Sequence, residues 1–574
     1  MNLRNKWFLL LAGLLSAMLV FAAACGSDDK DEPSGTPAAT ETEPTGSGDL
    51  APADQQKITI SSGEPQYLDP HRSSFEQDIG VERMIFRGLY NLTDDGQGGV
   101  KVEPGLAAGE PEVNGSVYTV KLKDGIKWSD GQPITAQHFV DGAKRGCDPA
   151  VAVDYGYLWG AGYLDMKGCS EFQANEDAAQ KQTLMDALGV RAVDDTTVEY
   201  TLNKPNGRFT TIMAIWVTFP ARLDVIEEHG EQWTAPENIV TSGPFTLTAY
   251  TPGDSLTLAP NSNWNGTKPA LQEITIKFLD DYSAAFRSFQ SDELQMTRIN
   301  ATDVVTAEGE GLADQVELVP TGRISWLLMQ TKNEVLSNFD VRLAMSRAID
   351  REALNEAAFD GVNTPAHYWV VKGISGHQGN EPFEGKVGFN PEEAKAALAR
   401  AGYPNGEGFP ELGITVNTPE RVAAAEFLQQ QFKEILNINI RIDQVDSQTR
   451  SARYTDETFE LFIGGWQLDY PDIENPMFGL WETDGGNNHT GCANPDVDAA
   501  LEAALAATSD EARIAAYQDM ETAVVENLCG GAPLWQDSVP YLVTAKLGGV
   551  VANGTIDAGA PGNYCAECWF VKAE

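Results

Sequence analysis

The stretch that decides the fold is AAEFLQQQFKEILNINIRI, residues 424–442. We predict a helix over about 424–436 that leads directly into a strand, because Ile438, Ile440 and Ile442 alternate with polar residues. Helices that alternate with strands build a sheet covered by helices. The sequence therefore predicts an α/β lobe in this region.

The same alternation continues on both sides of this stretch. Apolar residues between positions 341 and 349 recur at the spacing of an amphipathic helix. Another helix is expected to start where Asn390 caps Pro391, and to end at Gly402. Earlier in the chain we predict a helix over 81–89, and strands over 57–60, 117–122 and 274–278.

Length and charge narrow the range of functions. The chain has 574 residues and an ordinary hydrophobic content of 42%, so we expect two or more folded lobes. The formal net charge is −44; residues 1–24 carry two basic side chains, and residues 25–55 carry eight acidic and one basic, which leaves −39 on residues 56–574. So acidic a surface excludes a nucleic-acid binder and a protein that binds anionic lipid headgroups through its folded surface.

The amino-terminal residues predict export. A basic start is followed by an apolar run and then by Cys25, so we interpret residues 1–24 as a lipoprotein signal peptide. The residues before Cys25 resemble a bacterial lipobox, in which the cysteine becomes lipid-modified, although Ala22 stands where leucine is usual. Residues 25–55 are polar, so we expect a disordered tether. An uncleaved anchor or an ordinary signal peptide is the alternative.

The other cysteines predict disulfides. Six remain without Cys25, an even number that suggests pairing in an exported protein. Cys147 and Cys169 are close in sequence, so we expect them to pair. The later four are expected to pair among themselves in an order that stays open: Cys492, Cys529, Cys565 and Cys568. The last two have metal-knuckle spacing, but no second such motif accompanies them, so we expect no metal site, and their disulfide partners stay open.

Catalytic motifs are absent from the sequence. It contains no G-x-S-x-G, no P-loop, no H-E-x-x-H and no G-x-G-x-x-G. Acid pairs suited to glycoside hydrolysis arise by chance in so acidic a chain. We expect no catalytic residues and no cofactor, and a secreted hydrolase remains the alternative from another class.

Five segments, in order, carry a family resemblance. They are EPQYLDPH at 64–71, YTVKLKDGIKWSDGQPITA at 118–136, TSGPF at 241–245, FDVRLAMSRAIDR at 339–351 and GWQLDYPD at 465–472. They run through nearly the whole chain beyond the tether. The chain resembles the extracellular solute-binding proteins of family 5, the peptide and nickel group of ABC importers.

The resemblance implies an α/β fold of two lobes. It is the periplasmic-binding-protein-like clamp of type II, with the extra subdomain of the peptide-binding cluster and a ligand cleft between the lobes. Lobe I would comprise residues 56–310 and 520–574, with the extra subdomain at 91–235, and lobe II residues 311–519. Ligand would favour the closed arrangement, because both lobes contact it only there.

The resemblance also implies a function. The chain would be the substrate-binding component of an ABC importer, capturing peptides, with oligopeptides favoured, and delivering them to the membrane permease. We expect a monomer attached through lipidated Cys25 to the outer face of the cell membrane, in periplasmic or extracellular space. A nickel chelate, glutathione or an oligosaccharide is the alternative ligand. The acidic surface would serve either solvation in a salty or acidic habitat or the steering of cationic peptides.

Asp469 is the leading ligand-binding candidate. In peptide-binding members an aspartate at this place in the motif pairs with the ligand's α-ammonium, and a buried ammonium needs such a partner. The alternative is a solvated aspartate in a turn. Trp466, with Gly465 beside it, either walls a side-chain pocket or packs in the core.

Three earlier residues are implied at the cleft: Glu64, Pro65 and Gln66. In peptide-binding members this segment pairs its main chain with an extended peptide, and the alternative is a turn with Glu64 in solvent. Core or loop packing, rather than cleft lining, is expected for the aromatic stretch Tyr155, Tyr157 and Trp159. A polar helix face with ion pairs, rather than ligand binding, is expected for Arg342, Arg347 and Arg351.

Overall fold

The protein is described from a computed structural model, which covers residues 50–96, 98–152, 154–507 and 509–573. The predicted signal peptide, Cys25 and the tether up to residue 49 lie outside these residues. The end of the predicted tether is part of the folded body, because Leu50 pairs with Lys572 and the Ala51 amide donates to the Val571 carbonyl at 2.9 Å. Among the described residues no helix has the length and apolar character needed to cross a membrane.

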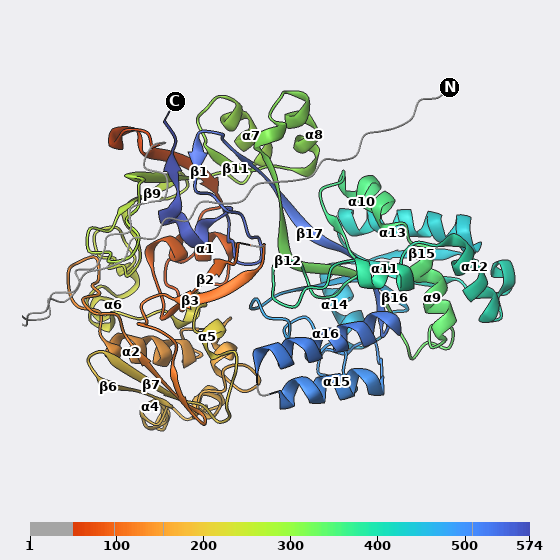
Figure 1. Ribbon diagram of the computed structural model, residues 1–574, viewed down its shortest axis with the longest axis horizontal. Helices are drawn as coiled ribbons and strands as arrows, with labels where there is room; N and C mark the ends of the chain where they lie inside the picture. Colours follow the sequence, from red (N-terminus) through yellow and green to blue (C-terminus); the bar gives the residue numbers. More distant parts are fainter. Residues whose placement is uncertain (1–49, 97, 153, 508, 574) are drawn as a thin grey trace, which may run out of the picture. The chain divides into compact units, whose positions relative to one another are not determined.

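A mixed sheet runs through the body (Figure 1). Its strands, in spatial order, are β15 (Ile440–Gln444), β14 (Leu412–Val416), β16 (Leu461–Gln467), β12 (Val316–Met329), β17 (Gly531–Val543), β11 (Met296–Arg298), β1 (Lys57–Ser62), β10 (Glu273–Phe278), β9 (Ser255–Pro260) and β8 (Phe245–Thr251), with β13 (Thr364–Pro365) paired to β17. The pairs β14–β15, β14–β16 and β1–β10 are parallel. The remaining end of the sheet, β10–β9–β8, is antiparallel. The parallel pairs agree with the predicted α/β class.

Smaller sheets complete the strands. One has the order β4 (Glu112–Asn114), β5 (Val117–Lys121), β7 (Thr197–Thr201) and β6 (Val190–Asp194). Two hairpin-like pairs are β2 (Tyr90–Asp94) with β3 (Val100–Pro104), and β18 (Leu547–Gly548) with β19 (Phe570–Val571).

Two hydrophobic cores define two lobes. Lobe I is built around a core whose residues lie within 58–296 and 543–569, joined by Tyr470. Lobe II is built around a core within 324–535. A small third cluster lies under α7 and α8. The family resemblance implies that the chain passes from lobe II back to lobe I at residue 520. However, α16 continues through that residue, and residues up to Trp535 pack in the second core. The chain therefore passes back to lobe I within β17.

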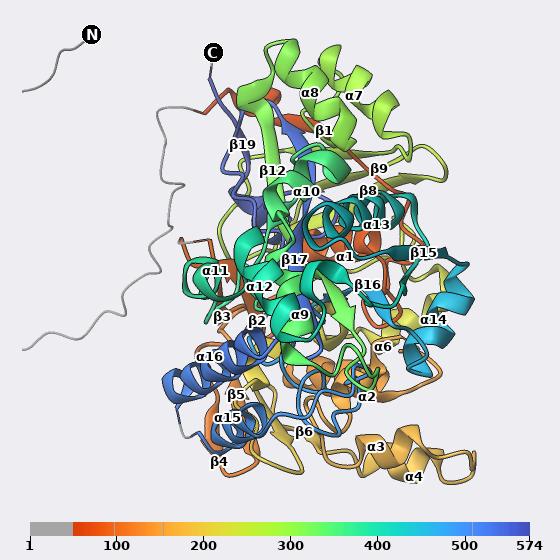
Figure 2. The same cartoon turned by 90° about the vertical axis from the view of Figure 1, so that its right-hand side faces the viewer.

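The helices follow the same division. Those of the first part are α1 (Glu76–Ile85), α2 (Ala136–Cys147), α3 (Cys169–Gln173), α4 (Lys181–Asp186), α5 (Phe209–Ile212), α6 (Leu223–His229), α7 (Tyr282–Gln290) and α8 (Ala301–Gly309). Those that follow are α9 (Phe339–Arg347), α10 (Arg351–Phe359), α11 (Glu381–Val387), α12 (Pro391–Arg400), α13 (Pro419–Gln431), α14 (Ser447–Thr455), α15 (Pro495–Ala506) and α16 (Asp510–Glu526). Figures 1 and 2 both show α15 and α16 side by side.

Most local predictions are confirmed and one is wrong. The Asn390 side chain accepts a hydrogen bond from the Glu393 amide and so caps α12, as its sequence predicts. The helix predicted over 81–89 instead ends at Ile85, because the next residues are extended and pair with another segment: the Arg87 amide donates to Ser242, and the Gly243 amide to the Ile85 carbonyl.

Long strands β12 and β17 connect the lobes. They pair antiparallel from Val316 to Leu328, and the register shifts between Pro320 and Ile324. Proline lacks the amide that a ladder needs, so the regular pairing stops there. A bulge of this kind bends the strand and redirects its side chains. Both lobes are therefore joined through one irregular stretch of ladder.

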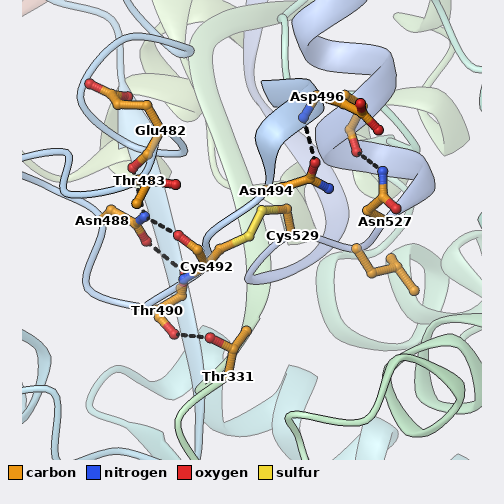
Figure 3. The surroundings of a disulfide bond; sticks show 12 residues. Thr331, Glu482, Thr483, Asn488, Thr490, Cys492, Asn494, Asp496, Asn527 and Cys529 are labelled. Atoms are coloured by element: carbon orange, nitrogen blue, oxygen red, sulfur yellow. Dashed lines mark hydrogen bonds between the residues drawn. A yellow bond between two sulfur atoms is a disulfide. The ribbon is translucent and has the colours of Figure 1, made fainter. Parts of the chain in front are cut away.

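Three disulfides are present among the described residues: Cys147–Cys169, Cys492–Cys529 and Cys565–Cys568. The first is the pairing that the sequence favours. Figure 3 shows the disulfide Cys492–Cys529, which joins the loop after β16 to the short connection between α16 and β17. In that loop the Asn488 side chain donates to the Cys492 carbonyl at 2.7 Å, and the Thr331 hydroxyl donates to the Thr490 carbonyl at 2.8 Å.

We predict that the disulfides differ in their effect on stability. A disulfide stabilises more when it closes a longer loop in the unfolded chain. Replacing Cys492 and Cys529 by alanine, which opens a loop with a separation of 37 residues, is expected to cost about 4 kcal/mol of unfolding free energy. The same change at Cys565 and Cys568, separated by 3 residues, is expected to cost about 2 kcal/mol. Urea unfolding of both variants measures this, and equal losses would contradict the loop-length account.

Candidate functional site

A cavity of about 820 Å³ lies between residues of the two lobes. Its volume is in the range of about 300–1,000 Å³ that is usual for small-ligand sites. Lobe I contributes Glu76, Ile79, Arg83, Tyr155, Ile215 and Trp216, and lobe II contributes Phe359, Arg421, Leu468, Asp469, Tyr470 and Trp535. The strands that connect the lobes contribute Thr321, Arg323, Asp537 and Ser538. The cavity is therefore the cleft expected between the lobes of a clamp.

The irregular stretch of β12 and β17 forms one wall of this cleft. There the Arg323 guanidinium pairs with the Asp537 carboxylate at 2.9 Å. Asp537 also accepts from the Ser325 hydroxyl at 3.1 Å and the Trp535 indole at 2.5 Å. Burial raises the pKa of Asp537, and the nearby Arg323 opposes the rise. The bulge thus brings charged side chains to the cavity rather than to the core.

Asp469 lines the cleft just after β16. One carboxylate oxygen accepts from the Tyr157 hydroxyl at 3.2 Å, and the other accepts from the Asn475 side-chain amide at 3.3 Å. Burial raises the pKa of Asp469, and these two hydrogen bonds oppose the rise. Neither partner carries a positive charge, so a cationic group beside Asp469 would relieve the cost of keeping a buried carboxylate ionised.

Asn475 organises the residues around Asp469. Its side-chain oxygen accepts from the Trp466 indole at 2.8 Å and from the Asp469 amide at 3.2 Å, while its nitrogen donates to the Asp469 carboxylate. Asn475 is 5% exposed. One buried amide therefore sets the positions of both Trp466 and Asp469. Asn475 was not among the predicted site residues, because no sequence pattern indicates that a residue before Pro476 contacts both Trp466 and Asp469.

Trp466 and Gly465 lie in β16 and do not line the cavity. Trp466 packs against the lobe II core and is held by Asn475. Gly465 pairs with Ser325 of β12. A methyl group at Gly465 would lie 2.8 Å from the Ile324 carbonyl oxygen and 3.1 Å from an Arg323 guanidinium nitrogen. This glycine therefore permits close approach of β12 and leaves room for Arg323.

The segment from Glu64 to Gln66 lies apart from the main cavity. Glu64 lines a second cavity of about 340 Å³, which shares Glu76, Tyr282 and Arg298 with the first. The Glu64 carboxylate accepts from the Tyr250 hydroxyl at 2.9 Å. Pro65 is buried, and the Gln66 amide donates to Asp78 at 2.7 Å. The Gln66 amide is thus already used, and this residue has no free donor for the main-chain pairing that the resemblance implied.

The aromatic stretch divides between the cleft and the core. Tyr155 and Tyr157 pack against the lobe I core, as expected. They also face the cleft, which was not expected: Tyr155 lines the cavity and Tyr157 donates to Asp469. Trp159 is buried in the lobe I core, as expected. The disulfide Cys147–Cys169 ties the two ends of the region that holds this stretch, which explains how a loop presents tyrosines to the other lobe.

The helix arginines serve the protein itself. Arg342 donates to the Leu528 and Leu336 carbonyls, Arg347 to that of Gly388, and Arg351 to that of Pro533. They bind main-chain carbonyls rather than the carboxylates of the expected ion pairs. None of the three lines the cavity.

The cleft combines charges of both signs. Its arginines come from both lobes and the connecting strands: Arg83, Arg298, Arg323 and Arg421. Burial lowers the pKa of Arg83 to about 10, and burial raises that of its neighbour Asp557. No group of His, Cys, Asp and Glu suited to a metal ion occurs among the residues that the structure describes. Such a cleft suits an organic ligand with both an ammonium and a carboxylate.

Comparisons with known proteins agree with this geometry. The model for the middle region of the bacterial extracellular solute-binding proteins, family 5, matches residues 101–488. The chain is 25% identical to the oligopeptide-binding protein OppA of Bacillus subtilis, over 86% of this chain and 89% of that one. It is 27% identical to the periplasmic murein peptide-binding protein MppA of Escherichia coli, over 92% and 95%. The solved structure of MppA in its unliganded open form has a TM-score of 0.79 at 24% identity, covering 92% of this chain and 99% of that one.

We predict that Gly465→Ala destabilises lobe II. The added methyl group meets the backbone of β12 and the Arg323 side chain, and overpacking of this kind costs about 1–3 kcal/mol. Gly385→Ala is the matched control, since no heavy atom outside its own helix lies within 4 Å of the added methyl group, and alanine favours the helix. Thermal unfolding of both variants checks this. Similar midpoints for the two would contradict the close approach described for Gly465.

Proposed function

The chain belongs to the bacterial extracellular solute-binding proteins of family 5, and from this membership we propose that it captures peptides outside the cell for an ABC importer. Oligopeptides are the favoured ligands, and a membrane permease would accept them from the closed clamp. The relatives named for oligopeptide and murein peptide binding support this choice of ligand. Alternation between open and closed lobes gives the mechanism, because a peptide that contacts both lobes favours closure.

The proposal rests on the half-buried Asp469 carboxylate, which lines the cleft and, among the described residues, accepts hydrogen bonds from the neutral side chains of Tyr157 and Asn475 alone. We propose that the peptide's α-ammonium supplies the missing positive charge. The Tyr157 hydroxyl and the Asn475 amide would keep the carboxylate in place. A charge-assisted hydrogen bond in such a site is worth about 1.5–3 kcal/mol.

We propose that the other predicted site residues shape the cleft around Asp469. Trp466 would steady Asn475, and Gly465 would keep Arg323 at the cleft wall. Glu64 would border the ligand only where it extends into the second cavity, and Pro65 and Gln66 would shape that edge. Tyr155 and Trp216 would contact side chains of the peptide, because both line the cavity.

We further propose where the protein works. Relatives are described as periplasmic proteins, and the lipobox-like residues before Cys25 support a lipid anchor on the outer face of the membrane. The tether would let a monomeric body reach the permease. The proposed role is binding without catalysis, so peptides incubated with the pure protein should be recovered intact.

We predict that Asp469→Ala weakens binding of free-amine peptides by about 10- to 100-fold. For the same peptides with an acetylated amino terminus, Asp469→Ala should change the affinity little, because these peptides carry no ammonium. Isothermal titration calorimetry measures both. Glu420→Gln is the control, since it removes the charge of another carboxylate that lines the cavity, and it should not discriminate between the two peptides. An equal loss for both peptides in Asp469→Ala would remove the ammonium assignment.

We predict that Cys25→Ala releases the protein from the membrane. The lipid would be attached to this thiol, and the described body has no helix suited to span a bilayer. Fractionation of producing cells should find the unaltered chain with membranes and the variant in the soluble fraction. Mass spectrometry of the unaltered chain should show a lipid on Cys25, and an unmodified cysteine there would contradict the anchor.

A further inference from the structure

A short segment after β16 bridges the two hydrophobic cores. We call residues 468–475 the bridging segment. Tyr470 is 4% exposed and packs with the lobe I core, whereas Ile473, three residues later, packs with the lobe II core. Apart from the strands that connect the lobes, the chain thus joins the cores again at the segment that carries Asp469.

Two arginines hold the bridging segment from opposite sides. Arg208, just before α5 in lobe I, pairs with Glu474 at 2.7 Å and donates to the Tyr470 hydroxyl at 2.8 Å. Arg513 of α16, in lobe II, makes two contacts of 2.7 Å to the Asp472 carboxylate. A guanidinium that binds a carboxylate by both nitrogens fixes its orientation. The segment is therefore fastened to each lobe by its own ion pair.

The Arg208–Glu474 pair is well shielded from water. The Arg208 side chain is 13% exposed and that of Glu474 is 7% exposed. Burial raises the pKa of Glu474 to about 7, and Arg208 opposes the rise. A pair this deeply buried contributes little net stability, but removing one partner leaves an uncompensated charge. Such a pair is better suited to fixing the geometry of the segment than to adding stability.

The two residues that Arg208 contacts lie between Asp469 and Asn475 in the chain. Tyr470 directly follows Asp469, and Glu474 directly precedes Asn475, which binds both Asp469 and Trp466. Arg208 therefore contacts the Asp469–Asn475 turn from within, at the residue after Asp469 and at the residue before Asn475. It also holds this turn against the lobe I loop that supplies the Tyr157 hydroxyl.

We propose that Arg208, through Glu474 and Tyr470, is a positioning residue that holds the Asp469 carboxylate beside Tyr157 for a primary ammonium group of the ligand. This inference rests on the proposed function. In this arrangement residues of both lobes form the ammonium site before the clamp closes. The amino terminus of the peptide would therefore bind first, at a site that is already formed. Pre-formed sites bind more tightly because less ordering is needed on binding.

The test compares Arg208→Gln, Glu474→Gln and the double variant. The affinity of each variant for one free-amine peptide, and for the acetylated form of that peptide, is measured by isothermal titration calorimetry. Each single variant should lose about tenfold in affinity for the free-amine peptide and less than about twofold for the acetylated one. The double variant should lose no more than the single ones, because residues that act as a unit are not additive. Arg72→Gln is the control, because it breaks a separate Arg–Glu pair, Arg72–Glu231, and should change neither affinity.

The outcomes separate this inference from the proposed function. If Asp469→Ala discriminates between the peptides but Arg208→Gln does not, the positioning role is wrong and the ammonium assignment stands. If Asp469→Ala does not discriminate, both are wrong. An equal loss for both peptides in Arg208→Gln would mean that Arg208 only stabilises the fold. Should Arg208→Gln not fold, Tyr470→Phe replaces it, because it removes only the hydrogen bond between Arg208 and the Tyr470 hydroxyl. An unchanged preference for the free amine relative to Arg72→Gln would then overturn the inference.

Discussion

The pairing of β12 with β17 is the constraint on which the rest of the structure depends. β17 runs from the lobe II core at Ala532 to the lobe I core at Val543, and β12 pairs with it along this length, so their ladder is the main connection between the lobes. The ladder is irregular where Pro320 interrupts it, and there the strands present Arg323 and Asp537 to the cleft. The connection between the lobes is thus also a wall of the site. Movement about this stretch would change the cleft directly, as a clamp requires.

The cleft differs in charge from the rest of the body. The body is strongly acidic, yet the cleft holds arginines from both lobes beside its carboxylates. Within it, Asp469 is held by neutral donors alone, while Asp472 and Glu474 nearby are each paired with an arginine. The three carboxylates of one short segment therefore have different environments. Two fasten the segment to the lobes, and the third is left for a ligand, which is the physical basis of the proposed function.

The sequence predicts this architecture well where local signals decide it. Asn390, Gly402 and the alternating isoleucines at 438–442 mark helix and strand limits that the structure repeats closely. The predicted end of the helix over 81–89 is wrong, because the residues after Ile85 form hydrogen bonds with the distant segment 242–243. Asp469 was found through its motif. Its partner Tyr157 is 312 residues away, and Arg208 is 262 residues from Tyr470. No periodicity links such residues, so only the folded chain brings them together.

The most direct measurement of the central claim is an experimental structure of the protein with a bound free-amine peptide. We expect the peptide to lie in the cleft between the lobes, with its α-ammonium nitrogen about 3 Å from an Asp469 carboxylate oxygen. We also expect the Arg208–Glu474 pair to remain intact beside that carboxylate. A peptide whose amino group faces solvent or another acid, with Asp469 still bound only by Tyr157 and Asn475, would contradict the account.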